Sequence, residues 1–297
     1  MGKGNKKKRG GGELSEEIPE ANKAAKVSEG GEKSGFRNKE KVLILTTRGI
    51  THRHRHLMLD LCQLIPHSKK DSKLDTKTDR QVINEVADLS GCTSCLFFEA
   101  RKRKDLYLWM AKSGAGPSVK FHVKNIHTMD ELKLTGNHLK GSRPVLSFHA
   151  AFDQEPHLQL LKEMFTQVFA TPKGHNKSKP FFDHVISFSV GDGHVWVRNY
   201  QTVLPQDKPK NAREMSLVEV GPRFCLNPVK IFAGSFQGVT LYENPAYVSP
   251  NTIRALEKKQ SQSKYKNKVQ TVSKRKEHIA ANKAPSNPLD DVFRGRR

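Results

Sequence analysis

The chain has 297 residues, a formal net charge of +22 and a sequence pI near 9.9. This positive balance points to a polyanionic partner such as nucleic acid. The sequence contains no apolar run of membrane-spanning length and no signal-peptide pattern, and its four cysteines fit a reducing compartment better than a disulfide scaffold, so we expect neither a membrane partner nor secretion.

Residues 1–40 are rich in Gly, Lys and Glu and almost lack large apolar side chains. Such a segment buries too little apolar surface to offset its ordering entropy, so we predict a disordered basic tail. Short basic runs are typical of nuclear import signals, although they also arise by chance. Two such runs are present: Lys6, Lys7, Lys8 and Arg9 near the start, and Lys274, Arg275 and Lys276 near the end.

A predicted strand, 42–46, leads into a predicted amphipathic helix, 53–65, and cations gather where the two meet. The cations of interest are Arg48, Arg53, Arg55 and His56. Cations at a helix N-terminus face the positive end of the helix dipole, whereas the free N–H groups there attract anions. We therefore predict that this cluster binds an anion such as phosphate. A solvated charged face is the alternative.

Histidines are interleaved with these arginines, and His52 and His56 stand about one helical turn apart. Two histidines at this spacing are a metal-ligand pattern, but the neighbouring arginines would repel a metal cation. We therefore expect no metal site here.

The middle of the chain, 41–248, is long enough to bury a core, and its predicted elements come in two similar sets. In the first half, about 41–135, the strand and helix above are followed by a helix at 79–89, strands at 95–99 and 106–111, and an alternating strand at 119–123. The turn between the two middle strands consists of Arg101, Lys102, Arg103 and Lys104. We predict that this hairpin tip of four cations contacts phosphates.

The second half, about 143–235, repeats that order. Its predicted elements are a strand at 144–149, a helix at 157–169, a hairpin of 185–190 and 194–200 with a Gly-Asp-Gly turn, and strands at 216–220 and 228–233. Each half has its only tryptophan, Trp109 or Trp196, in the second strand of its hairpin. We therefore predict an α/β fold built from a duplicated strand-helix-hairpin unit. The alternative is an ordinary α+β domain whose element order repeats by accident.

Residues 249–297 carry 13 Lys and Arg against 4 Asp and Glu. The Ser249-Pro250 pair is typical of a helix start, but few large apolar residues follow it. We predict a basic C-terminal arm, either a solvated helix or a disordered segment.

No motif in the sequence indicates catalysis. Cys92 and Cys95 have the spacing of a redox or zinc pair, but they follow a predicted helix rather than begin one, and no second ligand pair accompanies them. We interpret both as small core or turn residues. The sequence shows no nucleophile–base arrangement and no paired carboxylates in a recognisable frame, so we expect neither an enzyme nor a cofactor.

Arg198 and Tyr200 lie at the end of a predicted strand and suit single-stranded RNA. An arginine there can hold a phosphate while the tyrosine stacks on an unpaired base. The alternative is a core tyrosine beside a surface arginine. Lys69, Lys70 and Arg223 complete the candidate RNA-binding set.

Five long segments of the chain resemble the Brix-domain family and together span nearly all of 42–251. They are VLILTTRGITHRHRHLMLDLCQLIPHSKKDSKLD (42–75), GPSVKFHVKNIHTMDELKLTGNHLKGSRPVLSF (116–148), WVRNYQ (196–201), VEVGPRFCLNPVKIF (218–232) and YENPAYVSPN (242–251). Within them, the TTR strand end with Arg48, the Gly-Pro-Ser turn at 116–118 and the RNY strand end at 198–200 match family motifs.

The resemblance implies that 41–248 is a Brix domain whose two halves resemble anticodon-binding domains. It also implies a non-enzymatic ribosome biogenesis factor that binds precursor ribosomal RNA and promotes assembly of the large (60S) subunit in pre-60S particles. The implied location is the nucleolus, within the nucleus. A dedicated smaller nucleolar protein is the implied partner, and the family supplies no catalytic residue to transfer. The alternative is a structural adaptor that binds proteins in pre-ribosomes with little direct RNA contact.

Overall fold

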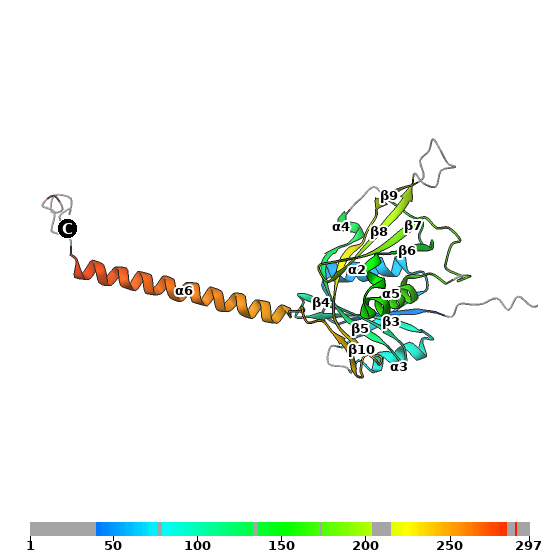
Figure 1. The fold of residues 1–297 in the computed structure, drawn as a ribbon, viewed down its shortest axis with the longest axis horizontal. Helices are drawn as coiled ribbons and strands as arrows, with labels where there is room; N and C mark the ends of the chain where they lie inside the picture. The colour runs from blue at the N-terminus through cyan, green and yellow to red at the C-terminus, as the bar shows by residue number, and fades with distance from the viewer. Residues whose placement is uncertain are drawn as a thin grey trace, which may run out of the picture.

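The computed structural model describes residues 40–75, 79–132, 136–172, 174–203, 215–283 and 289. Within them, an 11-stranded sheet carries helices on its faces (Figure 1). The strands are β1 (Val42–Thr47), β2 (Ser68–Leu74), β3 (Ser94–Arg101), β4 (Asp105–Lys112), β5 (Ser118–His127), β6 (Pro144–Phe148), β7 (His184–Gly191), β8 (His194–Val203), β9 (Ser216–Glu219), β10 (Arg223–Phe232) and β11 (Thr240–Glu243). The helices are α2 (His52–Leu64), α3 (Val82–Leu89), α4 (Met129–Leu132), the short 3-10 helix η1 (Ala150–Asp153), α5 (Pro156–Phe169) and α6 (Pro250–Ala281).

Apart from β2 at one end, the strand order is symmetric about the centre of the sheet. It runs β2-β1-β3-β4-β5-β10-β8-β7-β6, with β11 paired to β10 and β9 paired to β8. On each side of the antiparallel β5–β10 pair comes an antiparallel hairpin and then a parallel strand: β4, β3 and β1 on one side, and β8, β7 and β6 on the other. A unit duplicated about a two-fold axis through the central pair has this order. The predicted duplicated α/β fold is therefore confirmed.

Helices α2 and α5, which occupy equivalent places in the two halves, share one hydrophobic core. The predicted apolar stripes are buried: Leu57 and Leu61 in α2, and Leu161, Met164, Phe165 and Val168 in α5. Phe165 of α5 stacks on Phe121 of the first half with the ring centroids 5.9 Å apart, and on Phe188 of the second half at 4.8 Å. Because the rings of both halves interlock, the two halves are packed as one body.

The opposite face of the first half is covered by α3 and by the turn around Phe236. Phe236 contacts Trp109, and the cysteine pair lies in the same cluster. Cys92 and Cys95 are buried, as predicted, and burial raises the pKa of the Cys95 thiol to about 12. A thiol so far from ionisation is a poor nucleophile, which agrees with a packing role.

The strands at the centre of the sheet are both entered through a Gly-Pro pair. Gly116 precedes β5 and Gly221 precedes β10, each with φ of +88°. A side chain at Gly116 would also meet the backbone, because its Cβ would lie 2.5 Å from the carbonyl oxygen of Ala233. Glycine is therefore required there both by the left-handed backbone and by the close approach of the 232–234 segment.

Three sequence expectations need correction. The strand β2 was not predicted, because its residues SKKDSKL lack the apolar alternation of a strand; as an edge strand, it can pair with β1 while exposing its lysines. The strand β10 begins at Arg223 rather than at 228, and it joins the two halves instead of closing the second one. Helix α3 begins at Val82 rather than at 79.

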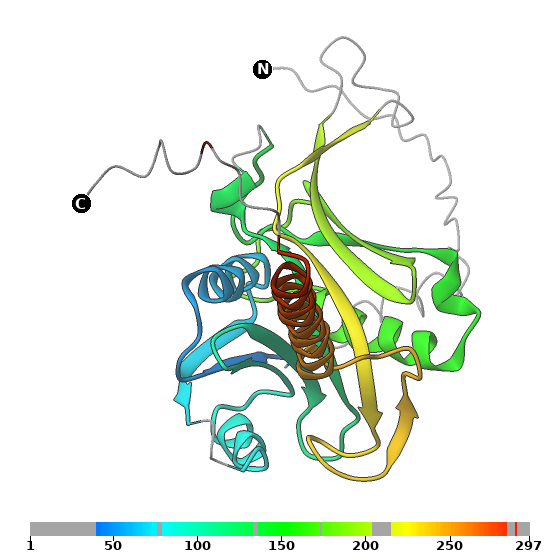
Figure 2. The ribbon, with the colours of Figure 1, turned by 90° about the vertical axis from the view of Figure 1, so that its left-hand side faces the viewer.

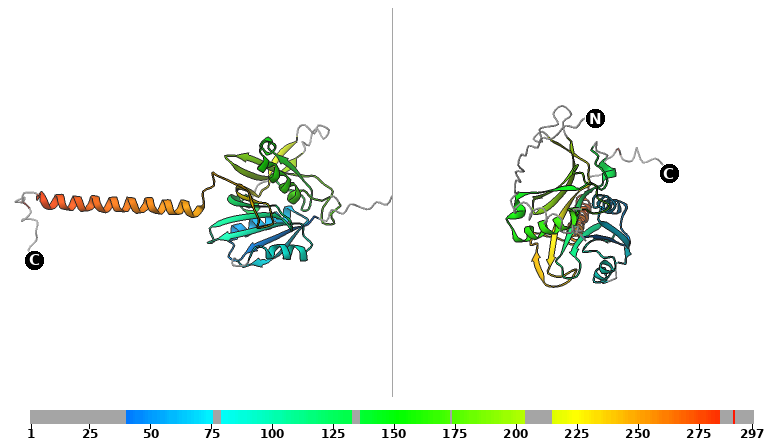
Figure 3. Two further views of the ribbon diagram at one scale, coloured as in Figure 1. Left: turned by 60° about the horizontal axis from the view of Figure 1, so that its bottom comes forward. Right: turned by 90° about the vertical axis from the view of Figure 1, so that its right-hand side faces the viewer.

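The C-terminal arm contains a helix, α6, which leaves the body and is exposed along nearly its whole length (Figures 1 and 3). Ser249 caps its start, accepting a hydrogen bond from the backbone N–H of Thr252, and Pro250 occupies the first turn. The Arg254 guanidinium donates two hydrogen bonds to the Asp105 carboxylate, at 2.9 and 2.6 Å. None of the helices in the described residues is long and apolar enough to cross a membrane.

Candidate nucleic-acid interface

The pairing register of the sheet brings most of the predicted cations to one end of the strands. The register pairs that show this are Thr46 with Phe98, Arg101 with Asp105, Leu106 with Val123, Arg223 with His127, and Phe224 with Val197. The end of β1, the β3–β4 turn, the start of β10 and the part of β8 around Arg198 therefore lie together, although β8 continues to Val203 and does not end at 200 as predicted. We call this end the cationic edge; its members are Arg48, Arg53, Arg55, His56, Arg101, Lys102, Arg103, Lys104, Arg198 and Arg223.

Two of the predicted cations at the start of α2 have a partner within the protein. Arg53 forms an ion pair with Glu131 of α4 at 2.8 Å, and Nδ1 of His56 lies 3.0 Å from the Asp130 carboxylate. These side chains surround a hollow of about 360 Å³ between the two helices. An external anion is therefore not needed to explain these two cations, because α4 supplies carboxylates at this place.

Arg48 and Arg55 remain available to bind an external anion. Arg48 lies in the turn after β1 and Arg55 on the first turn of α2, and both are exposed. Neither side chain forms an ion pair with any residue that the structure describes. Their charges therefore face solvent at the free N–H groups of α2, where a phosphate would be stabilised.

The hairpin tip holds its cations in a tight turn. Lys102 and Arg103 have φ of 51° and 55°, and the N–H of Lys104 donates to the carbonyl oxygen of Arg101 at 3.0 Å. Two successive residues with positive φ are typical of the two-residue turn that matches the twist of a hairpin, although Gly or Asn usually occupies it. Both side chains are exposed, so the turn presents cations at a fixed place on the cationic edge.

A largely buried carboxylate, Glu99, organises a further group of cations behind the tip. Its carboxylate accepts hydrogen bonds from Nε1 of Trp109 and Nε of Arg101, both at 2.8 Å, and lies 3.9 Å from the amine of Lys120. Burial lowers the pKa of Lys120 to about 8, although Glu99 opposes that shift. Lys120 also lies over the rings of Tyr107 and Trp109, at 4.7 and 4.9 Å.

The alternation of the predicted strand at 119–123 places Lys120 and His122 on the polar face opposite Val119 and Phe121, but both are largely buried. Sequence periodicity also does not reveal the cluster in which Lys120 lies over the rings of Tyr107 and Trp109, because its side chains come from neighbouring strands. The alternation of aromatic and basic residues along 107–124 is the signal that could have indicated it.

Arg198 and Tyr200 interact with each other on one face of β8. A hydrogen bond to Tyr200 raises the pKa of the Arg198 guanidinium, which remains exposed. Arg223 lies near Glu219, with an N–O distance of 3.5 Å. This pair of arginines therefore extends the cationic edge into the second half.

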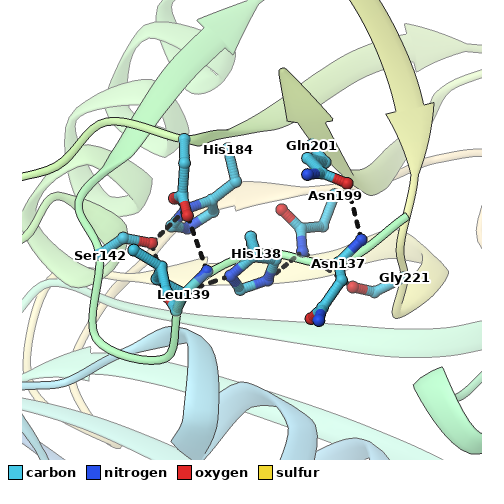
Figure 4. A network of polar contacts seen from close by, with 9 residues as sticks. Asn137, His138, Leu139, Ser142, His184, Asn199, Gln201 and Gly221 are labelled. Atoms are coloured by element: carbon cyan, nitrogen blue, oxygen red, sulfur yellow. Dashed lines mark hydrogen bonds and ion pairs between the residues drawn. The ribbon is translucent and has the colours of Figure 1, made fainter. Parts of the chain in front are cut away.

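Between Arg198 and Tyr200, Asn199 is buried and anchors this part of β8 (Figure 4). Its side-chain amide donates to the carbonyl oxygen of Gly221 at 2.9 Å and lies 3.1 Å from Nε2 of His138. His138 stacks flat on His184, with the ring centroids 4.3 Å apart. The middle residue of the RNY motif is thus structural, and it holds its two neighbours in place.

His138 and His184 also lie close to Asp183, and in the described part of the chain these three form the one group with metal-ligand chemistry. Their atoms already bond to one another and to the chain: Nδ1 of His184 lies 3.0 Å from Asp183 and 3.0 Å from the Ser142 hydroxyl. Burial lowers the pKa of His184, against the opposing effect of Asp183. We therefore interpret the group as a hydrogen-bond network.

The remaining predicted residues lie elsewhere. Lys69 and Lys70 are on β2, paired opposite Leu43 and Ile44, toward the start of β1 and away from the cationic edge. Lys274, Arg275 and Lys276 are exposed near the end of α6, and the run from Lys6 to Arg9 lies outside the described residues.

Comparison with known proteins identifies relatives over most of the chain. The family model described as Brix domain matches residues 47–230. "Ribosome biogenesis protein BRX1 homolog 1" of Arabidopsis thaliana is 56% identical, over 88% of this chain and 84% of its own. "Ribosome biogenesis protein BRX1 homolog" of Homo sapiens is 50% identical, over 88% and 72% respectively. "Ribosome biogenesis protein BRX1" of Saccharomyces cerevisiae is 48% identical, over 86% and 89%.

Proposed function

The chain belongs to the Brix domain family, and from this premise we propose that it is a ribosome biogenesis factor that binds precursor ribosomal RNA through its cationic edge. The observation that carries the proposal is the convergence of cations from both halves at one end of the sheet. Phosphate contacts from several rigidly placed arginines and lysines fix the register of a protein on RNA. The role is one of binding and placement, without a catalytic step.

We extend the proposal to the large subunit. The chain would join pre-60S particles in the nucleolus, and the exposed cluster Lys274 to Lys276 would support nuclear import. Helix α6 carries nine Lys and Arg against two Glu, so it adds sequence-independent affinity for RNA next to the hairpin tip. Its attachment through Arg254 and Asp105 directs this basic helix away from a defined point of the edge (Figure 2).

A protein-binding adaptor is the second candidate, and one feature of α6 favours it. Tyr265, Val269, Val272 and Ile279 recur at spacings of three, four and seven residues and are all exposed. A dedicated smaller nucleolar protein could pack a helix on this stripe. RNA binding by the edge and protein binding by α6 are compatible with each other.

RNA crosslinking in cells, followed by sequencing of the bound RNA and mapping of the crosslinked peptides, tests the proposal. We expect precursor ribosomal RNA, with crosslinked peptides from α2, the β3–β4 turn and the end of β8. Crosslinks confined to 1–40 and 249–297 would instead favour the adaptor. A chain without crosslinks to ribosomal RNA would contradict the proposed function.

A further inference from the structure

Two loops at the start of β6 and β7 present aromatic rings and cations together. Phe181 and Phe182, just before β7, are 56% and 59% exposed. Residues 139–143 and 174–182 contain Lys140, Arg143, Lys177 and Lys179, and no Asp or Glu. Two adjacent exposed phenylalanines do not contribute the stability that burial of their rings would give. Exposed aromatic pairs of this kind are typical of a binding surface.

The two loops are tied by their backbones. The N–H of Arg143 donates to the carbonyl oxygen of Phe181 at 2.8 Å, and the N–H of Lys179 donates to that of Gly141 at 2.7 Å. Gly141 has φ of +81°, and a Cβ there would lie 2.9 Å from the carbonyl oxygen of Lys177. Only glycine allows the loops to approach this closely.

The network in Figure 4 fixes these loops on the sheet. The hydroxyl of Ser142 donates to the carbonyl oxygen of Leu139 at 2.7 Å and faces His184. The Asp183 carboxylate accepts from the N–H of Leu139, also at 2.7 Å. The nearest acidic group is therefore engaged by the protein itself, and the cations beside the rings are left without a carboxylate among these loops.

Arg143 connects the rings and the charge. Its guanidinium lies 5.5 Å from the centre of the Phe182 ring. Its Nε is buried and has no hydrogen-bond partner among the described residues. A planar cation against an exposed ring extends the stacking surface and offers hydrogen-bond donors at its margin.

The two loops lie next to the end of β8. His184 pairs with Gln201 across the hairpin, and the N–H of Thr202 donates to the carbonyl oxygen of Asp183 at 2.9 Å. Phosphates held by Arg198 on the cationic edge would therefore place the following nucleotides near Phe181 and Phe182.

We propose that Phe181, Phe182 and Arg143, with Lys140, Lys177 and Lys179 around them, form a stacking platform for unpaired RNA bases. The proposal rests on the proposed RNA-binding function and adds the class of RNA that it takes. Aromatic rings bind unpaired bases by stacking, whereas the bases of a duplex are stacked on each other and cannot reach the rings. A protein partner is disfavoured as the ligand, because four cations without a free carboxylate suit a polyanion better.

Binding of the full chain to a short single-stranded RNA and to a duplex of equal length tests the platform. Phe181→Leu with Phe182→Leu keeps apolar side chains but removes the aromatic faces. We expect this variant to lose about tenfold or more in affinity for the single strand and little for the duplex. Phe181→Trp with Phe182→Trp should retain or increase single-strand binding. Val239→Ala with Leu241→Ala, an exposed apolar pair of which Val239 precedes the edge strand β11 and Leu241 lies on it, is the control and should bind like the native chain.

The outcomes separate the platform from the proposed function. A native chain that binds neither RNA contradicts both. A leucine variant that binds the single strand as tightly as the native chain contradicts the platform and leaves RNA binding standing. A leucine variant with unchanged RNA binding that no longer enters pre-ribosomal particles would mean that the two rings contact protein instead. Melting temperatures of all variants should agree within a few degrees, because the replaced side chains are exposed.

Discussion

At the start of α2, Arg53 and Arg55 are close in sequence but differ in their surroundings. Arg53 pairs with Glu131, and both side chains are substantially exposed, at 60% and 37%. Such a pair stabilises a fold by at most ~1 kcal/mol, and the helix dipole offsets part of this. Arg55 has no ion-pair partner among the described residues. The stabilising role of the two arginines is therefore small.

We predict that Arg53→Ala with Arg55→Ala changes the free energy of unfolding by less than about 1 kcal/mol and lowers RNA affinity severalfold. Thermal unfolding and RNA binding should be measured on the same samples. Lys69→Ala with Lys70→Ala removes the same charge away from the cationic edge and should weaken binding less. A lower melting temperature with normal RNA binding in the arginine variant would mean that the cluster is structural.

His67 is one of the buried histidines, His122 being another, that contribute to the response to acid. Burial lowers its pKa to about 4, from an ordinary value of 6.5, so it is neutral in the folded state. Between pH 6.5 and 4 the unfolded chain binds a proton that the folded chain does not. The stabilising contribution of His67 is thus present above pH 6.5 and is lost as the pH falls toward 4, by roughly 3 kcal/mol in full.

We therefore expect His67→Gln to flatten the dependence of melting temperature on pH between 6.5 and 4.5, whatever it does to stability at neutral pH. His278→Gln, in the exposed last turn of α6, is the control and should leave the slope unchanged. An unchanged slope in the His67 variant would show that other groups cause the acid response.

At the scale of elements, a bidentate contact between Arg254 and Asp105 ties α6 to the sheet. The Arg254 guanidinium, through its hydrogen bonds, holds the pKa of the Asp105 carboxyl below its usual range, although partial burial opposes this. A depressed carboxyl pKa means that the contact stabilises the fold above the unfolded pKa of about 4 and is lost as the pH falls below it. The first turn of α6 is thus anchored at neutral pH.

We predict that Asp105→Asn loosens the start of α6 without unfolding the body. Limited proteolysis between 249 and 260 should become faster, while the main melting transition moves little, because α6 is mostly exposed. Asp192→Asn, a carboxylate removed from the β7–β8 turn, serves as the control. Equal proteolysis rates in the native and Asp105 chains would mean that another contact anchors the helix.

Over the whole molecule, the charge of +22 should appear as a salt effect on binding. If the edge and α6 together neutralise about six phosphates, RNA affinity should fall roughly a thousandfold between 50 and 200 mM salt. Each released counterion adds about one to the slope of log affinity against log salt.

Deleting 255–297 removes the cations of α6 that follow Arg254, and it should reduce this slope while sparing the melting temperature, because the described residues removed are exposed. A flat response of the native chain would exclude phosphate contact as the main source of affinity. A large loss of melting temperature on deletion would show that the arm packs on the body.

The local order of elements could be predicted from the sequence, because periodicity is a local property. The stripe in α5, the Gly-Asp-Gly hairpin and the cationic turn were each correct to within a few residues. The repeat of the Gly-Pro pair before 118 and 223 was readable too, and it would have placed the start of β10 correctly. The polar β2 and the buried Lys120 could not be read in this way, since edge position and burial depend on neighbours far along the chain.

The candidate site, like the fold, could be predicted from the sequence only in part. Composition and residue spacing predicted a cationic protein with a duplicated α/β fold. They also identified most of the basic residues of the cationic edge, because charge and hydrophobic pattern are properties of the sequence itself. The partners of those residues follow from strand register: Arg53 meets Glu131, Arg254 meets Asp105, and Arg143 meets Phe182. Such contacts join segments whose distance depends on the whole sheet, and a shift of register by one residue would place each side chain on the other face. For that reason the cationic edge and the stacking platform became visible only in the folded molecule.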